Sequence, residues 1–146
     1  MNRPVKPLAA FFALPRGDRA LLVRAAATLV LVRAALHLVS IERLRAWTGL
    51  LRAGTRPADG IIWAVRTAAR RVPGNTCLCS ALALQRLLSS EGHKSQVHIG
   101  VARDTTGFIA HAWLVHDGAV VIGEEEHERY TRLTAWDARE TFGTPG

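Results

Sequence analysis

The sequence predicts an α+β fold, in which N-terminal helices pack on a core made of a cysteine-bearing helix and a small antiparallel sheet. Up to residue 93, apolar residues recur at intervals of three and four, which is the spacing of helices. Beyond it, short runs alternate and are rich in β-branched residues, which is typical of strands. A chain of 146 residues suits one hydrophobic core. We therefore expect one domain over 1–146, with a helical region at 1–56 and a core at 57–146.

Three helices are expected before the cysteines. Asp18 can cap a first helix over 19–39, and Ser40 can cap a second over 41–52. A third helix is expected at roughly 58–71. One side of the first helix carries an apolar stripe, which should pack on the rest of the domain: Leu21, Ala25, Leu29, Val32, Leu36 and Val39.

The N-terminal region is not expected to span a membrane or to act as a signal peptide. The most apolar stretch, 20–39, contains Arg24, Arg33 and His37, which argues against a transmembrane segment. The apolar run at 8–14 is short for a signal peptide. Two cysteines one residue apart do not easily form a disulfide with each other, which favours a reducing compartment. The sequence thus predicts a cytoplasmic protein.

The second half predicts strands at 96–102, 108–115 and 119–123. Asp117-Gly118 lies between the last two, and an Asp-Gly pair between apolar runs is the strongest short signal of a hairpin. A two-residue turn there sets the register of the hairpin. It pairs His116 with Ala119, Val115 with Val120, Trp113 with Ile122, and His111 with Glu124.

Both cysteines lie in the stretch "GNTCLCSALALQRLL" at 74–88. Asn75 or Thr76 can cap a helix that begins at Cys77 and runs to about residue 90. At 100° per residue, Cys77 shares the most apolar face with Ala81, Leu84 and Leu88. Cys79 falls nearly opposite, with Arg86 and Ser90. The wheel therefore predicts that Cys77, and not Cys79, points into the domain.

Cys77 is the candidate nucleophile, because free N–H groups and the macrodipole at a helix N-terminus stabilise a thiolate and an oxyanion. A thiolate also needs a base and a group that orients the base. His111 is the candidate base, since it lies in an apolar strand between two alanines. Glu124 is the candidate orienting carboxylate. Two alternatives stay open: His111 as an ordinary core residue, and Glu125 or Glu126 in place of Glu124.

Several classes of function are disfavoured. The net charge of +7 comes mostly from scattered arginines, without aromatic interleaving or a nucleic-acid motif. Solvated faces explain this charge best, and attraction to an acidic partner is the second explanation. The histidines have no zinc-type spacing, and no Walker or GxGxxG pattern is present, so neither a metal nor a nucleotide cofactor is expected. The other histidines are expected at surfaces or turns, with His98 a lesser candidate near the site.

The order of these motifs resembles a known family. It comprises a cysteine at a helix start, "ALALQRLL", an "IGV" strand, "FIAHAW", "DG" and then an acidic residue, over residues 77–124. This order is similar to that of the transglutaminase-like cysteine peptidases of lasso-peptide biosynthesis, which remove the leader from a precursor peptide. The helical residues 19–52 also resemble the N-terminal part of that family's stand-alone form.

The resemblance implies a transglutaminase/papain-like core with Cys77, His111 and Glu124 as the catalytic residues. The family usually has aspartate at the third position, so Glu124 is a departure. No recognition domain of the fused form precedes the catalytic region, and this implies a separate small leader-recognition protein. A macrolactam synthetase in the same pathway is implied as well. Two other functions remain open: a transglutaminase-type acyltransferase, and a non-catalytic adaptor that binds a peptide or a membrane.

Overall fold

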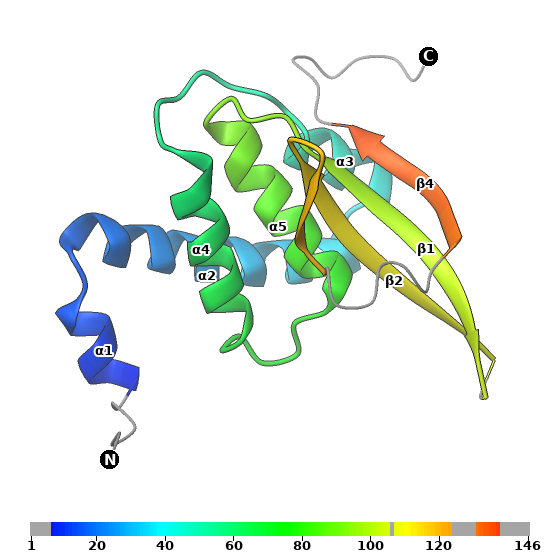
Figure 1. The fold of residues 1–146 in the computed structure, drawn as a ribbon, viewed down its shortest axis with the longest axis horizontal. Coiled ribbons are helices and arrows are strands. Elements are labelled where there is room, and N and C mark those ends of the chain that lie inside the picture. The colour runs from blue at the N-terminus through cyan, green and yellow to red at the C-terminus, as the bar shows by residue number, and fades with distance from the viewer. Residues whose placement is uncertain (1–6, 106, 124–130, 138–146) are drawn as a thin grey trace.

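The computed structural model describes residues 7–105, 107–123 and 131–137, in which five helices precede one four-stranded antiparallel sheet. The strand order across the sheet is β3-β2-β1-β4 (Figure 1). The elements are α1 (Pro7–Ala13), α2 (Arg16–Leu38), α3 (Ile41–Thr48), α4 (Ala58–Ala69), α5 (Cys77–Ser90), β1 (Gln96–Asp104), β2 (Gly107–His116), β3 (Ala119–Ile122) and β4 (Thr131–Asp137). This is the α+β arrangement that the sequence predicts.

Helix α5 is the centre of the fold. It packs against α2, α3 and α4, and its other side meets β2 and β1 (Figure 1). Because both sides are covered, α5 is buried almost around its whole circumference, from Cys79 to Ser89 except at Arg86. A helix that is buried all round belongs to the middle of a core.

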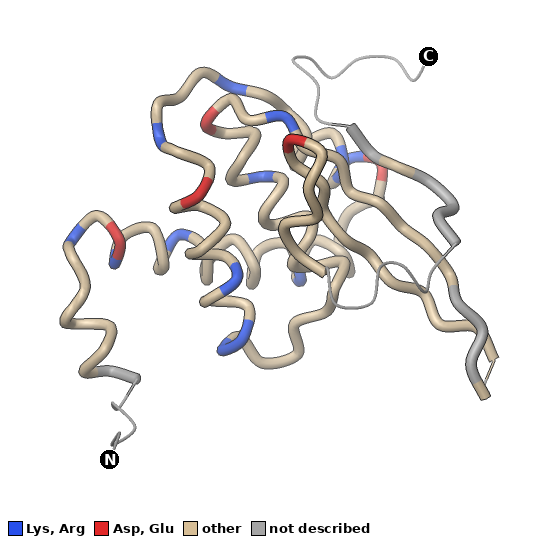
Figure 2. Tube along the Cα trace, viewed as in Figure 1, with Lys and Arg blue, Asp and Glu red and all other residues tan. Residues whose placement is uncertain are grey.

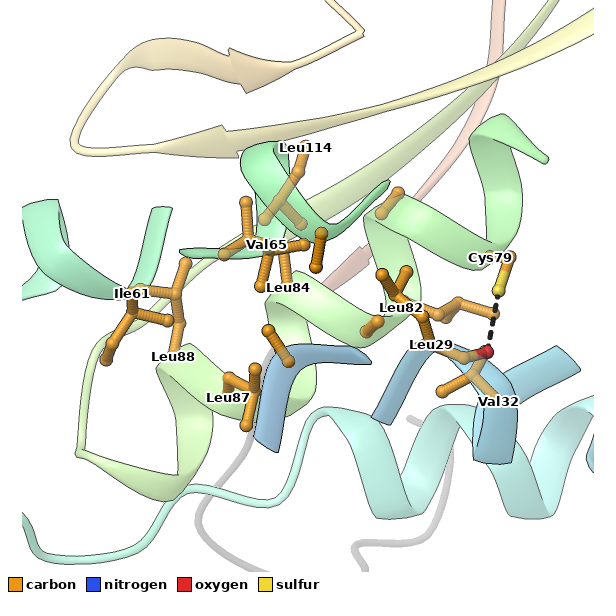
Figure 3. Packing of buried hydrophobic residues seen from close by; sticks show 14 of the residues in the cluster. Leu29, Val32, Ile61, Val65, Cys79, Leu82, Leu84, Leu87, Leu88 and Leu114 are labelled. Carbon is orange, nitrogen blue, oxygen red and sulfur yellow. Dashed lines mark hydrogen bonds between the residues drawn. The ribbon is translucent and has the colours of Figure 1, made fainter. Parts of the chain in front are cut away.

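The core joins the N-terminal helices to the sheet. Leu29 and Val32 of α2 lie beside Leu82 of α5. Leu114 of β2 belongs to the same cluster and packs on it from the side of the sheet (Figure 3). All four are fully buried. The expected apolar stripe of the first helix is confirmed at its first four members, which are buried, whereas Leu36 is half-buried and Val39 is 44% exposed. The packing of this stripe on the cysteine helix is confirmed.

The helix boundaries follow local capping. Helix α2 begins at Arg16, directly after Pro15, so Asp18 lies in the first turn and is not the cap. Ser40 caps α3 as expected, because its hydroxyl accepts a hydrogen bond from the Arg43 N–H. The expected end of this helix at residue 52 is wrong. It ends at Thr48, and the Arg52 N–H donates to the Ser89 carbonyl at 2.8 Å, outside any helix.

The hairpin is confirmed at its turn but not in its full register. Asp117 and Gly118 have φ angles of 49° and 76°, as a type I′ turn requires. His116 pairs with Ala119 and Val115 with Val120, as expected. The register then shifts, so that Ile122 pairs with Leu114 and not with Trp113. An extra residue in β3 causes this bulge, which a turn-based count cannot foresee.

Two elements were not expected from the sequence. Helix α1 occupies the short apolar run near the N-terminus, and β4 pairs antiparallel with β1. Strand β4 follows the acidic stretch 124–128, and its pairing depends on a strand some thirty residues earlier. Among the described residues, α2 is also the one helix long and apolar enough to cross a bilayer, although 28% of its apolar window is buried inside the protein.

Candidate active site

A capped turn presents Cys77 at the start of α5. The Thr76 hydroxyl accepts a hydrogen bond from the Cys79 N–H at 3.2 Å, so Thr76 is the N-cap, one of the two residues expected. Asn75 Nδ2 donates to Ser80 Oγ at 2.6 Å and ties the turn to the helix. Cys77 is therefore the first helical residue, in the position expected from the sequence.

The thiol of Cys77 lies against β2. The Ala112 backbone N–H donates a hydrogen bond to Cys77 Sγ, with N and S 3.4 Å apart. Strand N–H groups alternate in direction, and the His116–Ala119 pair places those of His116, Leu114 and Ala112 on the β3 side. Since β3 ends at Ile122, opposite Leu114, the Ala112 N–H has no strand partner there. The Cys77 sulfur therefore accepts the hydrogen bond that a longer β3 would accept from Ala112.

The His111 side chain lies on the opposite face of β2 and contacts the same edge of this strand, where β3 ends. Adjacent strand residues point to opposite faces, so Ala112 packs in the core while the half-buried His111 lies with Trp113. The two rings are stacked, 6.1 Å apart at 23°. His111 Nε2 lies 3.2 Å from the carbonyl oxygen of Gly123, directly after β3.

This contact orients the ring of His111. A carbonyl oxygen only accepts hydrogen bonds, so Nε2 is the donor in this contact. The Gly123 carbonyl thus supplies one orienting contact to the ring. Glu124, for which that role was predicted, lies outside the described residues.

Gly123 is closely packed at this edge. Its φ is 80°, and an added Cβ would lie 2.9 Å from the Ala112 oxygen and 2.9 Å from Trp113 Cβ. A side chain at residue 123 would therefore push the end of β3 away from β2. Arg66 of α4 lies nearby and donates to the Val121 carbonyl at 3.5 Å.

Cys79 is not turned to the outside, and the wheel prediction is wrong on this point. Its side chain is 1% exposed, and its thiol donates to the Leu29 carbonyl at 3.2 Å (Figure 3). The wheel assumes one buried face, but α5 is enclosed by α2 as well as by the sheet. Burial raises the pKa of the Cys79 thiol, against smaller opposing effects of the Arg33 charge and nearby backbone groups.

Three of the other histidines, His93, His98 and His116, have structural partners. His93 Nε2 contacts the Arg56 carbonyl at 2.8 Å, and His116 Nδ1 contacts the Lys94 carbonyl at 2.7 Å. His98 is buried and not a surface residue as expected; it packs on the side of Trp113, with ring centroids 5.7 Å apart. Within the described part of the chain, no three His, Cys, Asp or Glu side chains are grouped so that they could hold a metal ion.

Sequence reasoning missed the residues that support the site. Trp113 and Gly123 contact or position His111, and Arg33 of α2 holds the turn before Cys77 through a 2.6 Å hydrogen bond to the Pro73 carbonyl. The tryptophan follows the histidine by two residues in "AHAW", a spacing that places two strand side chains on one face. No local signal links Arg33 to a turn forty positions later.

A helix N-terminal cysteine beside a histidine-bearing strand is the arrangement of cysteine-dependent acyl-transfer enzymes. The family model described as transglutaminase-like superfamily matches residues 21–135, and the chain belongs to this superfamily. Its members are generally cysteine-dependent enzymes, and the domain indicates peptidase or acyltransferase chemistry. No curated protein and no solved structure is similar enough to count as a match.

Proposed function

We propose that this protein is the leader peptidase of a lasso-peptide pathway and cleaves the leader from a precursor peptide. The observation that carries the proposal is the position of Cys77. It is the first residue of α5, and its sulfur accepts a hydrogen bond from the backbone N–H of Ala112, the residue after His111. The resemblance of residues 77–124 to lasso-peptide maturation proteases names the substrate class. Membership of the transglutaminase-like superfamily supports the acyl-enzyme chemistry.

In the proposed mechanism, His111 takes the proton of the Cys77 thiol. The sulfur attacks the carbonyl at the leader–core junction, and a tetrahedral intermediate forms whose oxyanion the free N–H groups at the start of α5 bind. His111 then gives the proton to the amine as the C–N bond breaks, leaving a thioester on Cys77. Water, deprotonated by His111, attacks the thioester carbonyl, and the C–S bond breaks. The leader leaves with a free carboxyl group, and His111 returns the proton to the Cys77 sulfur. Glu124 is proposed as the carboxylate that supports the imidazolium.

We further propose that a separate small recognition protein brings the leader to this site, and that a macrolactam synthetase acts in the same pathway. The protein is proposed to work in the cytoplasm. The chemistry needs no metal or organic cofactor, because the thiol, the imidazole and the backbone N–H groups supply the nucleophile, the base and the oxyanion contacts.

The test is an incubation of the protein with a precursor peptide, with and without the recognition protein, followed by mass spectrometry. Cleavage that yields an intact leader and core supports the proposal, and Cys77→Ala must abolish it. An added primary amine separates the peptidase from an acyltransferase, since a transferase would give a leader amide, heavier than the free leader acid by the amine minus one water. An unchanged precursor with every partner present would contradict the proposal.

A further inference from the structure

The side of α2 that faces away from the core is apolar as well. Val23, Val30, Leu31 and Leu38 are 58%, 56%, 54% and 81% exposed, and Phe12 of α1 is 66% exposed. On a helical wheel these α2 residues lie opposite the buried ones, together with Ala20, Ala27 and Ala34. We call this set the outer face of α2. Such a contiguous exposed apolar face marks an interaction surface.

The outer face cannot be the lipid-facing side of a spanning helix. Leu21, Ala25, Leu29 and Val32, on the other side of α2, are committed to the core with α4 and α5. Crossing a bilayer would expose this inner side and dismantle the core. A helix held in this way presents one face only, and that face can lie flat on a surface.

Two hollows open beside the outer face. One of about 510 Å³ lies between α1 and α2, with Phe11, Ala20 and Val23 in its wall together with Arg16, Arg19 and Arg24. The second, of about 240 Å³, lies between α2 and α3 and is lined by Leu31, Val39, Trp47 and Arg43 among others. The first hollow thus combines apolar side chains with three guanidinium groups, and the second combines them with one.

The charges beside the outer face are positive. Figure 2 shows basic positions at the α1–α2 end of the molecule, where Asp18 is the acidic residue of the helix. Arg19 Nε is buried and has no hydrogen-bond partner within the described residues. Arg24 donates to Ser90 Oγ and pairs with Glu91 at 3.7 Å, but its side chain is still 48% exposed. Three arginines, Arg16, Arg19 and Arg24, therefore line the larger hollow, and their charges favour an anionic group there.

We propose that the outer face of α2, with α1, docks on an anionic membrane surface. The apolar side chains would enter the headgroup boundary, while Arg16, Arg19 and Arg24 would meet acidic lipid headgroups. From Val23 to Leu38 the face runs about 22 Å along the helix. The members of the face are alanine, valine and leucine throughout, and Arg24 at its border is cationic, which suits an anionic lipid surface. This inference is independent of the proposed peptidase function.

Vesicle flotation of the full chain tests the proposal. The protein should float with vesicles of phosphatidylcholine that contain phosphatidylglycerol, and much less with phosphatidylcholine alone. The double substitution Val30→Ser and Leu31→Ser should lower binding about ten-fold, because both side chains lose their burial in lipid. Arg16→Gln should lower binding about five-fold, and added salt should weaken binding by the wild type.

Matched controls lie elsewhere on the molecule. Phe108 and Ile109 of β2 are 74% and 39% exposed, so Phe108→Ser with Ile109→Ser removes similar apolar area without touching α2. Arg70→Gln removes an exposed charge from the end of α4. Both controls should float like the wild type. If circular dichroism shows that the α2 double variant is unfolded, Leu38→Ser, at the most exposed position, replaces it.

Three results would overturn the proposal. The first is no flotation with either vesicle. The second is equal flotation of the wild type and the folded α2 variant. The third is a lipid-free dimer, seen by light scattering, that the α2 variant converts to a monomer, because the occupant of the outer face would then be a second copy of the chain.

Discussion

The Arg33 guanidinium donates a 2.6 Å hydrogen bond to the Pro73 carbonyl and so ties α2 to the turn that precedes Cys77. Gly74 makes this approach feasible. Its φ is 70°, and a Cβ there would lie 2.5 Å from Arg33 Nη1. The N-terminal helices therefore support the core and also hold the loop that presents the candidate nucleophile.

Arg33→Ala should lower kcat clearly, although it should lower the free energy of unfolding only slightly. The lost hydrogen bond is exposed, and its removal should cost about 1 kcal/mol of unfolding free energy. The turn before Cys77 would lose its anchor, so we expect kcat to fall with little change in KM. Arg70→Ala, which makes the same change in net charge, is the control. Equal kcat for both variants would show that Arg33 does not position the turn.

The two thiols should behave differently. Cys77→Ala should abolish cleavage, whereas Cys79→Ser should keep most of it, because a serine hydroxyl can still donate to the Leu29 carbonyl. Alkylation at neutral pH should label the half-buried Cys77 first, since Cys79 is buried and burial raises its pKa. Faster labelling of Cys79, together with loss of activity on its substitution, would reverse the assignment.

Cys79 should also make stability fall at alkaline pH. The pKa of its thiol in the folded protein is raised above the ordinary value of 9.0. Below that value the thiol is protonated in both states, and its contribution to stability is complete. Above it the unfolded state loses its proton first, so the free energy of unfolding falls as pH rises toward the folded-state pKa. Urea denaturation at about pH 8 and about pH 10.5 should show a smaller fall for Cys79→Ser than for the wild type.

The third catalytic residue should be Glu124. We predict a carboxylate oxygen of Glu124 within hydrogen-bond reach, ~2.6–3.2 Å, of a His111 ring nitrogen in a substrate-bound structure. His111→Ala should lower the rate of cleavage by roughly 10²–10⁴-fold. Glu124→Gln should lower it less, because an amide can still orient the ring. Glu125→Gln and Glu126→Gln serve as controls, and a larger loss in either would move the role to that residue.

Gly123→Ala should be more harmful than Gly118→Ala. Both glycines have positive φ, 80° and 76°, so both substitutions carry a similar backbone strain of about 1–3 kcal/mol. Around Gly118 the space is open, whereas a Cβ at Gly123 would meet Ala112 and Trp113. We expect the Gly123 variant to lose activity in addition to stability, since the carbonyl that holds His111 must shift. Equal activity of the two variants at matched folded fractions would contradict this role for Gly123.

The sequence by itself determined four of the five described helices, the turn of the hairpin and the position of Cys77. These features depend on neighbours within a few residues: Thr76 caps the helix that Cys77 begins, and Asp117-Gly118 makes the turn because both residues tolerate positive φ. Local hydrogen bonds and local apolar spacing suffice for such features, so a short stretch of sequence is enough to predict them.

Only the tertiary structure decided how the site is supported. Cys79 is buried because α2 covers a side of α5 that the wheel leaves open, and the hairpin register shifts because of one bulge beyond the turn. The Ala112 N–H meets Cys77 Sγ because β3 ends early, and Arg33 reaches Pro73 across forty residues of chain. The contacts of Cys79, Cys77 and Arg33 join residues that are distant in sequence, and packing of the whole core, not local propensity, selects them.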